Sequence, residues 1–149
     1  MLALREKIGT DPLWLSGVTA VVLRDHEVLL VKRADNGRWT PVTGIIDPGE
    51  QPAVAAERET LEEAGIVARV EGLTWVQVLQ PIVYPNGDQS QFIDLVFTCS
   101  YVSGEPFPVD GENSEVRWFD LDALPELEHN MIERILSAVK FDGTTRFER

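Results

Sequence analysis

The strongest constraint on the fold lies between residues 44 and 66, where the sequence predicts one helix bounded by clear start and stop signals. Pro52 suits the first turn of a helix, because the N–H that proline lacks would have no partner there. Gly65 suits the left-handed residue that often follows the last turn. We therefore predict a helix over residues 52–64. The preceding segment, residues 43–50, contains two glycines and a proline and is predicted to be a loop.

Apolar runs separated by turn signals surround this helix and predict strands on both sides of it. The predicted strands are residues 18–23, 28–31, 66–70, 73–79, 92–101 and 116–119. The predicted turns are residues 25–27, 34–37 and 84–88. Strands interleaved with helices are typical of an α/β domain with helices on both faces of a sheet.

Two further helices are predicted near the ends of the chain. A short one ends at Gly9, and apolar residues recurring every four positions from Leu127 to Val139 mark an amphipathic helix. We expect residues 1–149 to form one domain, with an N-terminal arm over residues 1–15. The polar tail, residues 142–149, is expected to fray.

The composition excludes several classes of protein. The chain has 25 acidic and 13 basic residues, a formal net charge of -12, so it should repel the phosphate backbone of nucleic acid. No apolar stretch approaches the length that spans a membrane, and the first residues lack the apolar core of a signal peptide. We therefore expect a cytoplasmic location. The single cysteine, Cys99, excludes an intramolecular disulfide and is predicted to be buried in a strand.

The predicted helix gathers three carboxylates on one side. At about 100° per residue, Glu59, Glu62 and Glu63 share a face roughly 100° wide. Val54 and Leu61, with Ala64, fall opposite and are expected to pack on the sheet. Like charges at this spacing repel by about 0.2–0.5 kcal/mol per pair, which a hard divalent cation such as Mg²⁺ or Mn²⁺ would relieve. A solvated face rich in glutamate is the alternative.

The residues around these glutamates resemble a known family motif. The matching positions are Gly44, Glu50, Arg58, Glu59, Glu62, Glu63 and Gly65, followed by apolar Ile66. This resembles the Nudix box, G-x5-E-x7-R-E-U-x-E-E-x-G-U, in which U is aliphatic, and all seven fixed positions match. Thr60 departs from the aliphatic preference, and Val42-Thr43 stand where family members often carry Pro-Gly. The resemblance implies an α/β/α sandwich with a mixed sheet, covering nearly the whole chain.

The resemblance also implies a reaction: hydrolysis of the diphosphate bond in a nucleoside diphosphate derivative, with Mg²⁺, or Mn²⁺, as cofactor. It assigns Glu59, Glu62, Glu63 and the Gly44 carbonyl to the metal. A further glutamate outside the box, Glu112 or Glu115, is expected to act as base or extra ligand.

The remaining box residues have predicted supporting roles. Arg58 is expected to brace the carboxylates by charge-assisted hydrogen bonds. Glu50 is expected to cap the start of the helix. Gly44 and Gly49 permit a tight loop, and Gly65 ends the helix.

Contacts with the substrate are predicted outside the box. Arg33 and Arg38 are candidates to contact phosphate or base, and Trp39 and Tyr84 to stack a nucleobase, with core packing as the alternative for both aromatic residues.

The identity of the substrate is only weakly marked. Pro81 lies fifteen residues beyond Ile66, which resembles ADP-ribose pyrophosphatases, whereas Tyr84 resembles a tyrosine of dinucleoside polyphosphate hydrolases. We favour an ADP-ribose-like nucleotide sugar. Dinucleoside polyphosphates and oxidised nucleoside triphosphates stay open.

Two other classes of protein compete with this interpretation. One is a nucleotide-binding module that keeps the fold without catalysis. The other resembles isopentenyl diphosphate isomerase and would need Cys99 as an active-site cysteine. The arm before Ser16 is expected to take part in any homodimer contact.

Overall fold

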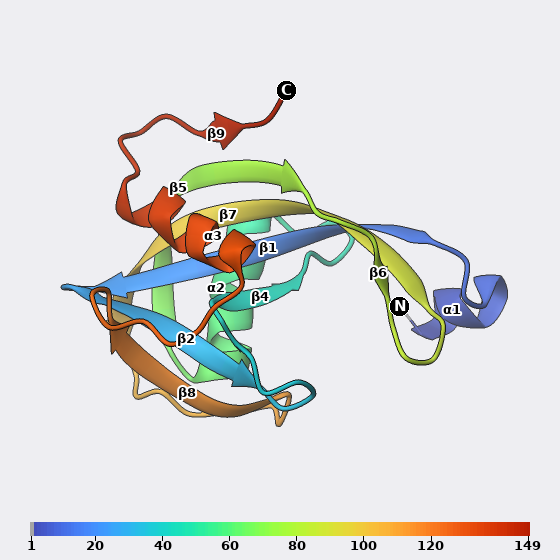
Figure 1. The fold of residues 1–149 in the computed structure, drawn as a ribbon, viewed down its shortest axis with the longest axis horizontal. Coiled ribbons are helices and arrows are strands. Elements are labelled where there is room, and N and C mark those ends of the chain that lie inside the picture. Colours follow the sequence, from blue (N-terminus) through green and yellow to red (C-terminus); the bar gives the residue numbers. More distant parts are fainter. Residues whose placement is uncertain (1) are drawn as a thin grey trace.

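The computed structural model describes residues 2–149 and has a mixed β-sheet with helices on both faces (Figure 1). The elements are α1 (Leu2–Ile8), β1 (Leu13–Arg24), β2 (Glu27–Arg33), β3 (Trp39–Thr40), β4 (Val42–Ile45), α2 (Pro52–Ala64), β5 (Val67–Val78), β6 (Ile82–Val83), β7 (Gln89–Ser103), β8 (Asn113–Asp120), α3 (His129–Val139) and β9 (Arg146–Phe147). Helix α2 has the predicted bounds, and Gly65 follows it in the left-handed conformation, with φ 69°.

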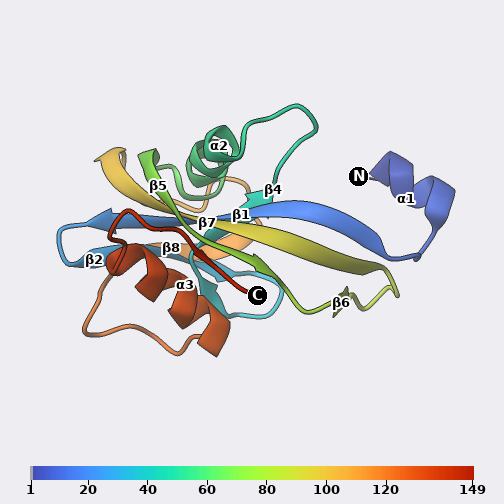
Figure 2. The ribbon, with the colours of Figure 1, turned by 90° about the horizontal axis from the view of Figure 1, so that it is seen from above.

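Strand β1 is the centre of the sheet. It pairs parallel with β7 and antiparallel with β2 and β4, and the main order is β3-β2-β1-β7-β5-β9. Strand β8 pairs with β2, and β6 with β7. Helices α2 and α3 lie on opposite faces (Figure 2). The predicted α/β/α sandwich with a mixed sheet is confirmed.

Each face of the sheet carries its own apolar core. Along β2, Leu29 and Val31 belong to the core under α2, whereas Val28 and Leu30 belong to the core under α3. This alternation follows from the two-residue period of a strand. Because β2 is buried on both faces, its residues 28–31 are a continuous run of apolar residues instead of an alternating pattern.

Three predicted segments differ in the structure. Residues 43–45 were predicted as loop, but they belong to β4, because pairing with residues 17–20 of β1 outweighs the low strand propensity of Gly44. Two strands were predicted over residues 66–70 and 73–79, but residues 67–78 form one bulged strand, β5. The tail does not fray throughout, since β9 pairs with β5 and the Thr145 hydroxyl donates to the Leu73 carbonyl.

Helix α2 is rotated relative to the prediction. Val54 and Leu61 were expected to pack on the sheet, but they are 54% and 51% exposed. Ala64 is fully buried, as predicted, but the small side chains of Ala55 and Ala56 are buried in place of Val54 and Leu61. Small residues let the helix approach the sheet closely. Glu59 and Glu63 consequently turn inward, whereas Glu62 stays about half exposed.

The N-terminal arm projects beyond the sheet together with the β6 hairpin (Figure 2). The Arg5 side chain ties α1 to this hairpin by donating hydrogen bonds to the Gln89 carbonyl and the Ser90 hydroxyl. Trp14 and Val83 are exposed there. A homodimer contact through this arm stays a prediction. No helix within residues 2–149 is long and apolar enough to cross a membrane.

A buried polar network joins α3 to the sheet. The Thr19 hydroxyl donates to the Asp94 carboxylate at 2.9 Å and accepts from Arg134 Nη1 at 3.1 Å. Arg134 Nε lies 3.6 Å from Asp94 Oδ2. Gln77 contacts the same carboxylate and pairs with Asn130 on α3. These contacts fix α3, and with it the loop that precedes α3, against the centre of the sheet.

Candidate metal centre on helix α2

Glu59 lies directly against the backbone of β4. A Cβ atom added at Gly44 would stand 2.3 Å from both Cγ and Cδ of Glu59, which is closer than any real contact. Any side chain at position 44 would therefore displace the Glu59 side chain from its present position. Burial, as the largest influence, raises the pKa of Glu59, and the nearby Arg58 opposes that shift.

Arg58 connects the box loop to the helix. Its Nη1 donates to Glu59 Oε1 at 2.9 Å and to Glu62 Oε2 at 3.1 Å, while Nη2 reaches the Ile45 carbonyl at 3.2 Å. Its Nε donates to Glu50 Oε2 at 2.7 Å and Nη2 to Glu50 Oε1 at 2.9 Å. This guanidinium thus holds three carboxylates and a backbone carbonyl in one arrangement.

Glu50 does not cap helix α2, contrary to the prediction. The N-cap residue is Gln51, which makes no side-chain cap hydrogen bond. Glu50 instead accepts hydrogen bonds from the Arg58 side chain and from the Asp47 N–H. These contacts, with Arg58 as the larger influence, lower the pKa of Glu50 to about 2. The bidentate pairing with Arg58 directs the carboxylate away from the helix N-terminus, so its role is to close the loop.

Glu63 is the most deeply buried of the three helix carboxylates. The residue is 5% exposed, and its Oε2 atom has no hydrogen-bond partner within residues 2–149. Burial, followed by the negative charges of Glu59, Asp110 and Glu112, raises the pKa of Glu63 to about 8. A buried carboxylate oxygen without a donor is costly unless a cation or proton meets it.

The donor atoms of this region suit a hard divalent cation. All are oxygens, and Glu62 is about half exposed, which leaves the centre open to water and to phosphate oxygens. A bound cation would also satisfy the Glu63 Oε2 atom, which has no hydrogen-bond donor within residues 2–149. Glu59, Glu62 and Glu63 therefore fit Mg²⁺ or Mn²⁺.

The loop between β7 and β8 brings two more carboxylates to Glu63. One oxygen each of Glu63, Asp110 and Glu112 lie within 4.8 Å of one another. Glu112 was predicted from the sequence, whereas Asp110 was missed, because no local pattern shows which loop crosses the end of α2. Glu115 is not part of this cluster: it is on β8, 3.8 Å from Lys32.

The predicted phosphate-contacting arginines occupy different surroundings. Arg33 donates twice to Asp35, at 3.1 and 3.0 Å, and this hydrogen bonding is the main cause of its raised pKa. Arg38 forms an ion pair with Glu128. This pair belongs to the lining of a pocket of about 520 Å³. The lining residues are Lys32, residues 37–39 and residues 125–128.

The two aromatic residues predicted to contact the substrate lie in different parts of the structure. Trp39 lines this pocket and packs edge-on against Phe119, with ring centroids 4.8 Å apart, so it serves both core and pocket. Tyr84 lies at the turn after β6, in the projecting hairpin, and is 40% exposed. Figure 2 shows β6 well away from α2.

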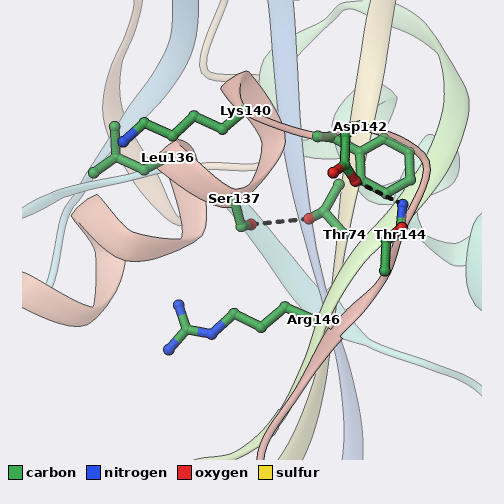
Figure 3. Close-up of a pocket in the computed structure, with 8 residues that line it drawn as sticks. Thr74, Leu136, Ser137, Lys140, Asp142, Thr144 and Arg146 are labelled. Carbon is green, nitrogen blue, oxygen red and sulfur yellow. Dashed lines mark hydrogen bonds between the residues drawn. The ribbon is translucent and has the colours of Figure 1, made fainter.

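A second pocket, of about 230 Å³, lies between α3 and the C-terminal segment (Figure 3). Among its lining residues, Thr74 and Ser137 are hydrogen-bonded to each other at 2.9 Å, and Lys140 and Arg146 are basic. It contains no residue of the box. Its lining therefore gives no reason to place the chemistry there.

Cys99 cannot act as the nucleophile of an isomerase. The residue is 2% exposed on β7, and burial, followed by the charge of Glu57, raises the pKa of its thiol to about 12. The reactive thiolate is therefore scarce at neutral pH. This geometry disfavours the isomerase alternative.

Gly44→Ala is expected to lower Mg²⁺ affinity at least about tenfold, because the new methyl group must displace Glu59. Isothermal titration calorimetry measures this change. Gly49→Ala is the control: its φ of 82° makes an alanine strained there, but its added Cβ would meet nothing within 4 Å. We expect Gly49→Ala to retain Mg²⁺ affinity within about threefold; an unchanged affinity in Gly44→Ala would contradict the assignment of Glu59.

Comparison with known proteins agrees with this geometry. Residues 14–138 match the family model of the NUDIX domain. A MutT-like protein of Streptomyces ambofaciens is 34% identical over 122 residues, which cover 81% of this chain and 73% of that protein. The NAD-capped RNA hydrolase NudC of Chromobacterium violaceum is 31% identical over 116 residues, covering 76% of this chain but only 41% of that relative. This chain thus spans about two fifths of the NudC protein.

A solved structure shares the fold. An ADP-ribose pyrophosphatase from Streptococcus suis superposes with a TM-score of 0.68, covering 90% of this chain and 98% of that one. The two sequences are 22% identical. At this identity the likeness establishes the architecture alone.

Proposed function

Since this chain belongs to the Nudix family of hydrolases, we propose that it hydrolyses the diphosphate linkage of a nucleoside diphosphate derivative, with Mg²⁺ or Mn²⁺ as cofactor. The observation that carries the proposal is the buried Oε2 atom of Glu63 beside Glu59, which has no hydrogen-bond partner in the described part of the chain. A chain without a cation to bind would gain nothing from this costly arrangement.

Each box residue then has a specific task. A bound divalent cation supplies charge neutralisation for the diphosphate and a water of lowered pKa. Glu59, Glu62 and Glu63 bind it, and Arg58 positions two of these carboxylates through its hydrogen bonds. Glu112 is the remaining candidate for the acidic residue outside the box, because Glu115 points elsewhere.

The proposed substrate is an ADP-ribose-like nucleotide sugar. Pro81 supports it, as does the activity named for the Streptococcus suis neighbour. NudC is named for an NAD-capped substrate, and NAD, like ADP-ribose, contains ADP joined through its diphosphate to a second ribose. Dinucleoside polyphosphates and oxidised nucleoside triphosphates are the second choice; Pro81 and Tyr84 both adjoin β6 on the projecting hairpin, so their positions do not separate the choices.

We assign the nucleoside end of the substrate to the pocket of about 520 Å³ beside β3. Its volume lies in the range of small-molecule sites. Trp39 offers an aromatic surface and Arg38 a cation, whose ion pair with Glu128 has to open when an anionic group enters. Arg33 is assigned to the phosphate side, because its charge acts on Glu63.

Arg38→Gln is expected to raise KM about five- to tenfold while kcat stays within about threefold, because the residue contacts the substrate away from the reacting phosphorus. Steady-state kinetics with ADP-ribose checks this. Arg69→Gln removes a charge on β5 that is 76% exposed, against 61% for Arg38, and should leave both constants unchanged. Equal KM values for the wild type and Arg38→Gln would contradict the assignment of this pocket.

The experiment that tests the function is a substrate screen of the purified protein. ADP-ribose, other nucleotide sugars, nucleoside triphosphates, dinucleoside polyphosphates and coenzymes are incubated with Mg²⁺ or Mn²⁺, and the products are identified. We expect hydrolysis to nucleoside monophosphate and a second phosphorylated product, abolished by EDTA. Binding of these compounds without turnover would favour the non-catalytic module instead.

A further inference from the structure

We propose that Arg117 and Lys32 form a phosphate subsite at the edge of the pocket of about 520 Å³, and that this subsite binds a phosphate on the ribose of the substrate's nucleoside. The preferred substrate is then a nucleoside diphosphate derivative that is also phosphorylated on O2′ or O3′. This inference rests on the proposed function, which assigns the nucleoside to this pocket, and it deepens the substrate class of that site.

The register of three strands gathers two basic side chains around Trp39. Lys32 on β2 is the cross-strand partner of Trp39 on β3, and Leu30 on β2 is the partner of Arg117 on β8. Cross-strand partners point to the same face of a sheet, as do residues two apart on one strand. Leu30 belongs to the core under α3, so Lys32, Trp39 and Arg117 all point to the face that α3 covers.

Both cations lie next to the Trp39 ring. The Arg117 Cζ atom is 5.3 Å from the centroid of this ring and 4.7 Å from that of Phe119, and the Lys32 Nζ atom is 6.0 Å from the Trp39 centroid. Lys32 and Trp39 also line the pocket. Contact with an aromatic ring positions a guanidinium without neutralising its charge. An anionic group that enters the pocket beside Trp39 therefore meets two cations.

Arg117 and Lys32 are free to bind an anion. Arg33 and Arg38 each form a close ion pair with a carboxylate, whereas Arg117 has none within 4.0 Å among residues 2–149. The Lys32 Nζ atom is 3.8 Å from Glu115 Oε2, and both side chains are more than a third exposed, so this pair contributes little and can open. Arg117 is exposed as well, so its guanidinium can bind a phosphate without first losing a carboxylate partner.

The alternation of side chains along β2 separates this subsite from the diphosphate. Arg33 follows Leu29 and Val31 on the face that α2 covers, whereas Lys32 points to the opposite face. The proposed metal site and Arg33 therefore meet the diphosphate on one side of the sheet, and Lys32 and Arg117 lie on the other side. Since O5′ of the nucleoside carries the diphosphate, the remaining ribose hydroxyls, O2′ and O3′, are the positions from which a further phosphate would reach these cations.

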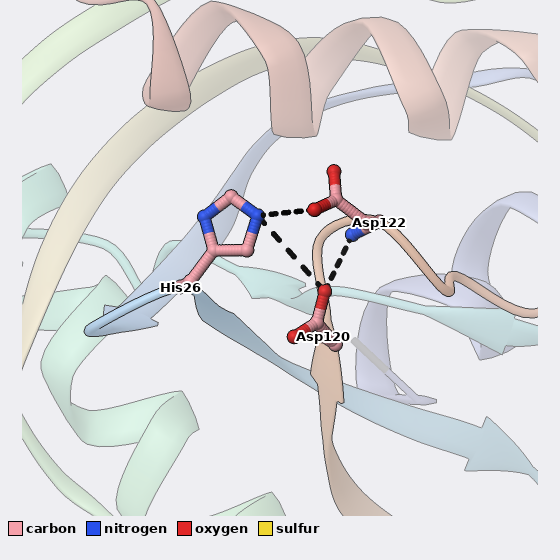
Figure 4. Close-up of side chains that lie close together, drawn as sticks. All are labelled: His26, Asp120 and Asp122. Atoms are coloured by element: carbon pink, nitrogen blue, oxygen red, sulfur yellow. Dashed lines mark hydrogen bonds and ion pairs between the residues drawn. The ribbon is translucent and has the colours of Figure 1, made fainter.

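The opposite end of β2 and β8 carries acidic side chains instead. There His26, in the turn before β2, faces Asp120 and Asp122 (Figure 4). Its Nε2 atom lies 3.0 Å from Asp122 Oδ2 and 3.9 Å from Asp120 Oδ1. Asp120 is the cross-strand partner of Glu27, which is five residues, or about 17 Å, along β2 from Lys32. The basic side chains therefore gather at the end of these strands where the pocket lies.

The test measures binding of product analogues that contain no diphosphate bond. Calorimetric titration of the whole chain in EDTA compares AMP with adenosine 2′,5′-bisphosphate and adenosine 3′,5′-bisphosphate. We expect one bisphosphate to bind the wild type at least about fivefold more tightly than AMP, and its identity shows which hydroxyl carries the phosphate. In Arg117→Gln this ratio of affinities should fall to within about twofold, while the affinity for AMP stays within about threefold of the wild type.

Two further variants control for charge and for folding. Arg117→Lys keeps the charge and should keep a ratio of at least about threefold, and Arg69→Gln, at an exposed position on β5, should keep the wild-type ratio. A wild-type ratio within about twofold for both bisphosphates, or a ratio that Arg117→Gln leaves unchanged, would overturn the proposal. Loss of AMP binding in Arg117→Gln would also overturn it, because the residue would then only support Trp39. Absence of binding by all three nucleotides would do the same.

Failure of the subsite and failure of the proposed function give different results. Binding in EDTA requires neither a metal ion nor turnover, so equal affinities for AMP and the bisphosphates would refute the subsite and leave the proposed hydrolysis intact. Absence of turnover in the substrate screen, together with tighter binding of one bisphosphate, would refute the proposed function and keep the subsite.

Discussion

Glu63→Gln is expected to reduce hydrolysis at least about 100-fold and, at the same time, to stabilise the metal-free protein at pH 8. The loss of activity follows because Gln cannot supply the negative charge that holds the cation near the diphosphate. The gain in stability follows because Glu63 is buried and its Oε2 has no hydrogen-bond partner among residues 2–149. A single substitution should therefore raise the stability of the metal-free protein and lower its activity.

Glu63 makes the free energy of unfolding decrease as the pH rises. The pKa of Glu63 is raised to about 8 in the folded protein, from 4.5. Between these values the folded state binds more protons than the unfolded state, so the free energy of unfolding falls as pH rises. The contribution of Glu63 is complete below the unfolded pKa and is lost as pH rises through 8. Glu63→Gln removes this slope.

Urea unfolding in EDTA at pH 5, 6.5 and 8 measures the effect. We expect Glu63→Gln to exceed the wild type by about 1–3 kcal/mol at pH 8 and to approach it at pH 5, since each pKa unit corresponds to about 1.4 kcal/mol. Glu62→Gln is the control, because Glu62 is about half exposed: activity should fall similarly, with metal-free stability within about 0.5 kcal/mol. Full activity in both variants would remove the basis of the metal assignment.

The ends of helix α2 could be predicted because local chemistry determines them. Pro52 begins the helix and Gly65, with φ 69°, follows it, as their intrinsic preferences require. The turn over residues 84–88, between β6 and β7, was predicted for the same reason, and in it the Tyr84 N–H donates to the Asp88 carbonyl at 2.8 Å. Signals within a few residues survive folding because tertiary contacts do not oppose them.

The rotation of α2 could not be predicted by ranking side chains by hydropathy. That ranking buries Val54 and Leu61, yet the structure buries alanines and Glu63. A close approach between helix and sheet needs small residues, and close approach is what brings the carboxylates to Gly44. Thr60 fits the same account: it is fully buried, and its hydroxyl donates to the Ala56 carbonyl at 2.8 Å, so the departure from an aliphatic residue leaves no polar group unsatisfied.

Contacts between segments far apart in the chain could not be predicted from the sequence either. Asp110 reaches Glu63 only because the loop after β7 crosses the end of α2, where the Phe107 N–H meets the Ala64 carbonyl. Glu115 was an equal candidate to Glu112 on sequence alone. The pairing of β8 with β2 separates them, since it places Glu115 opposite Lys32.

Arg134→Met is expected to lower the free energy of unfolding by about 3–5 kcal/mol, because it leaves Asp94 buried without its cationic partner. Asp94 is 3% exposed and Arg134 is 5% exposed. Burial is the main cause of both the raised pKa of Asp94 and the lowered pKa of Arg134. The Thr19 hydroxyl, which is hydrogen-bonded to both side chains, would keep only its hydrogen bond to the Asp94 carboxylate. Urea unfolding at pH 7 measures the loss, and Arg69→Met, at an exposed position, should cost less than about 0.5 kcal/mol.

The double variant Asp94→Asn/Arg134→Met distinguishes the lost ion pair from lost packing. If the unpaired charge is the cost, the double variant should recover at least half of the stability that Arg134→Met loses. The deficit of Arg134→Met should also shrink at pH 5, since protonating Asp94, whose pKa is raised, removes the charge. A deficit that is equal at both pH values and in both variants would mean that Arg134 acts by packing alone. Because α3 begins directly after residues 125–128 of the pocket, an ion-pair defect should also raise KM for the substrate, through movement of that wall.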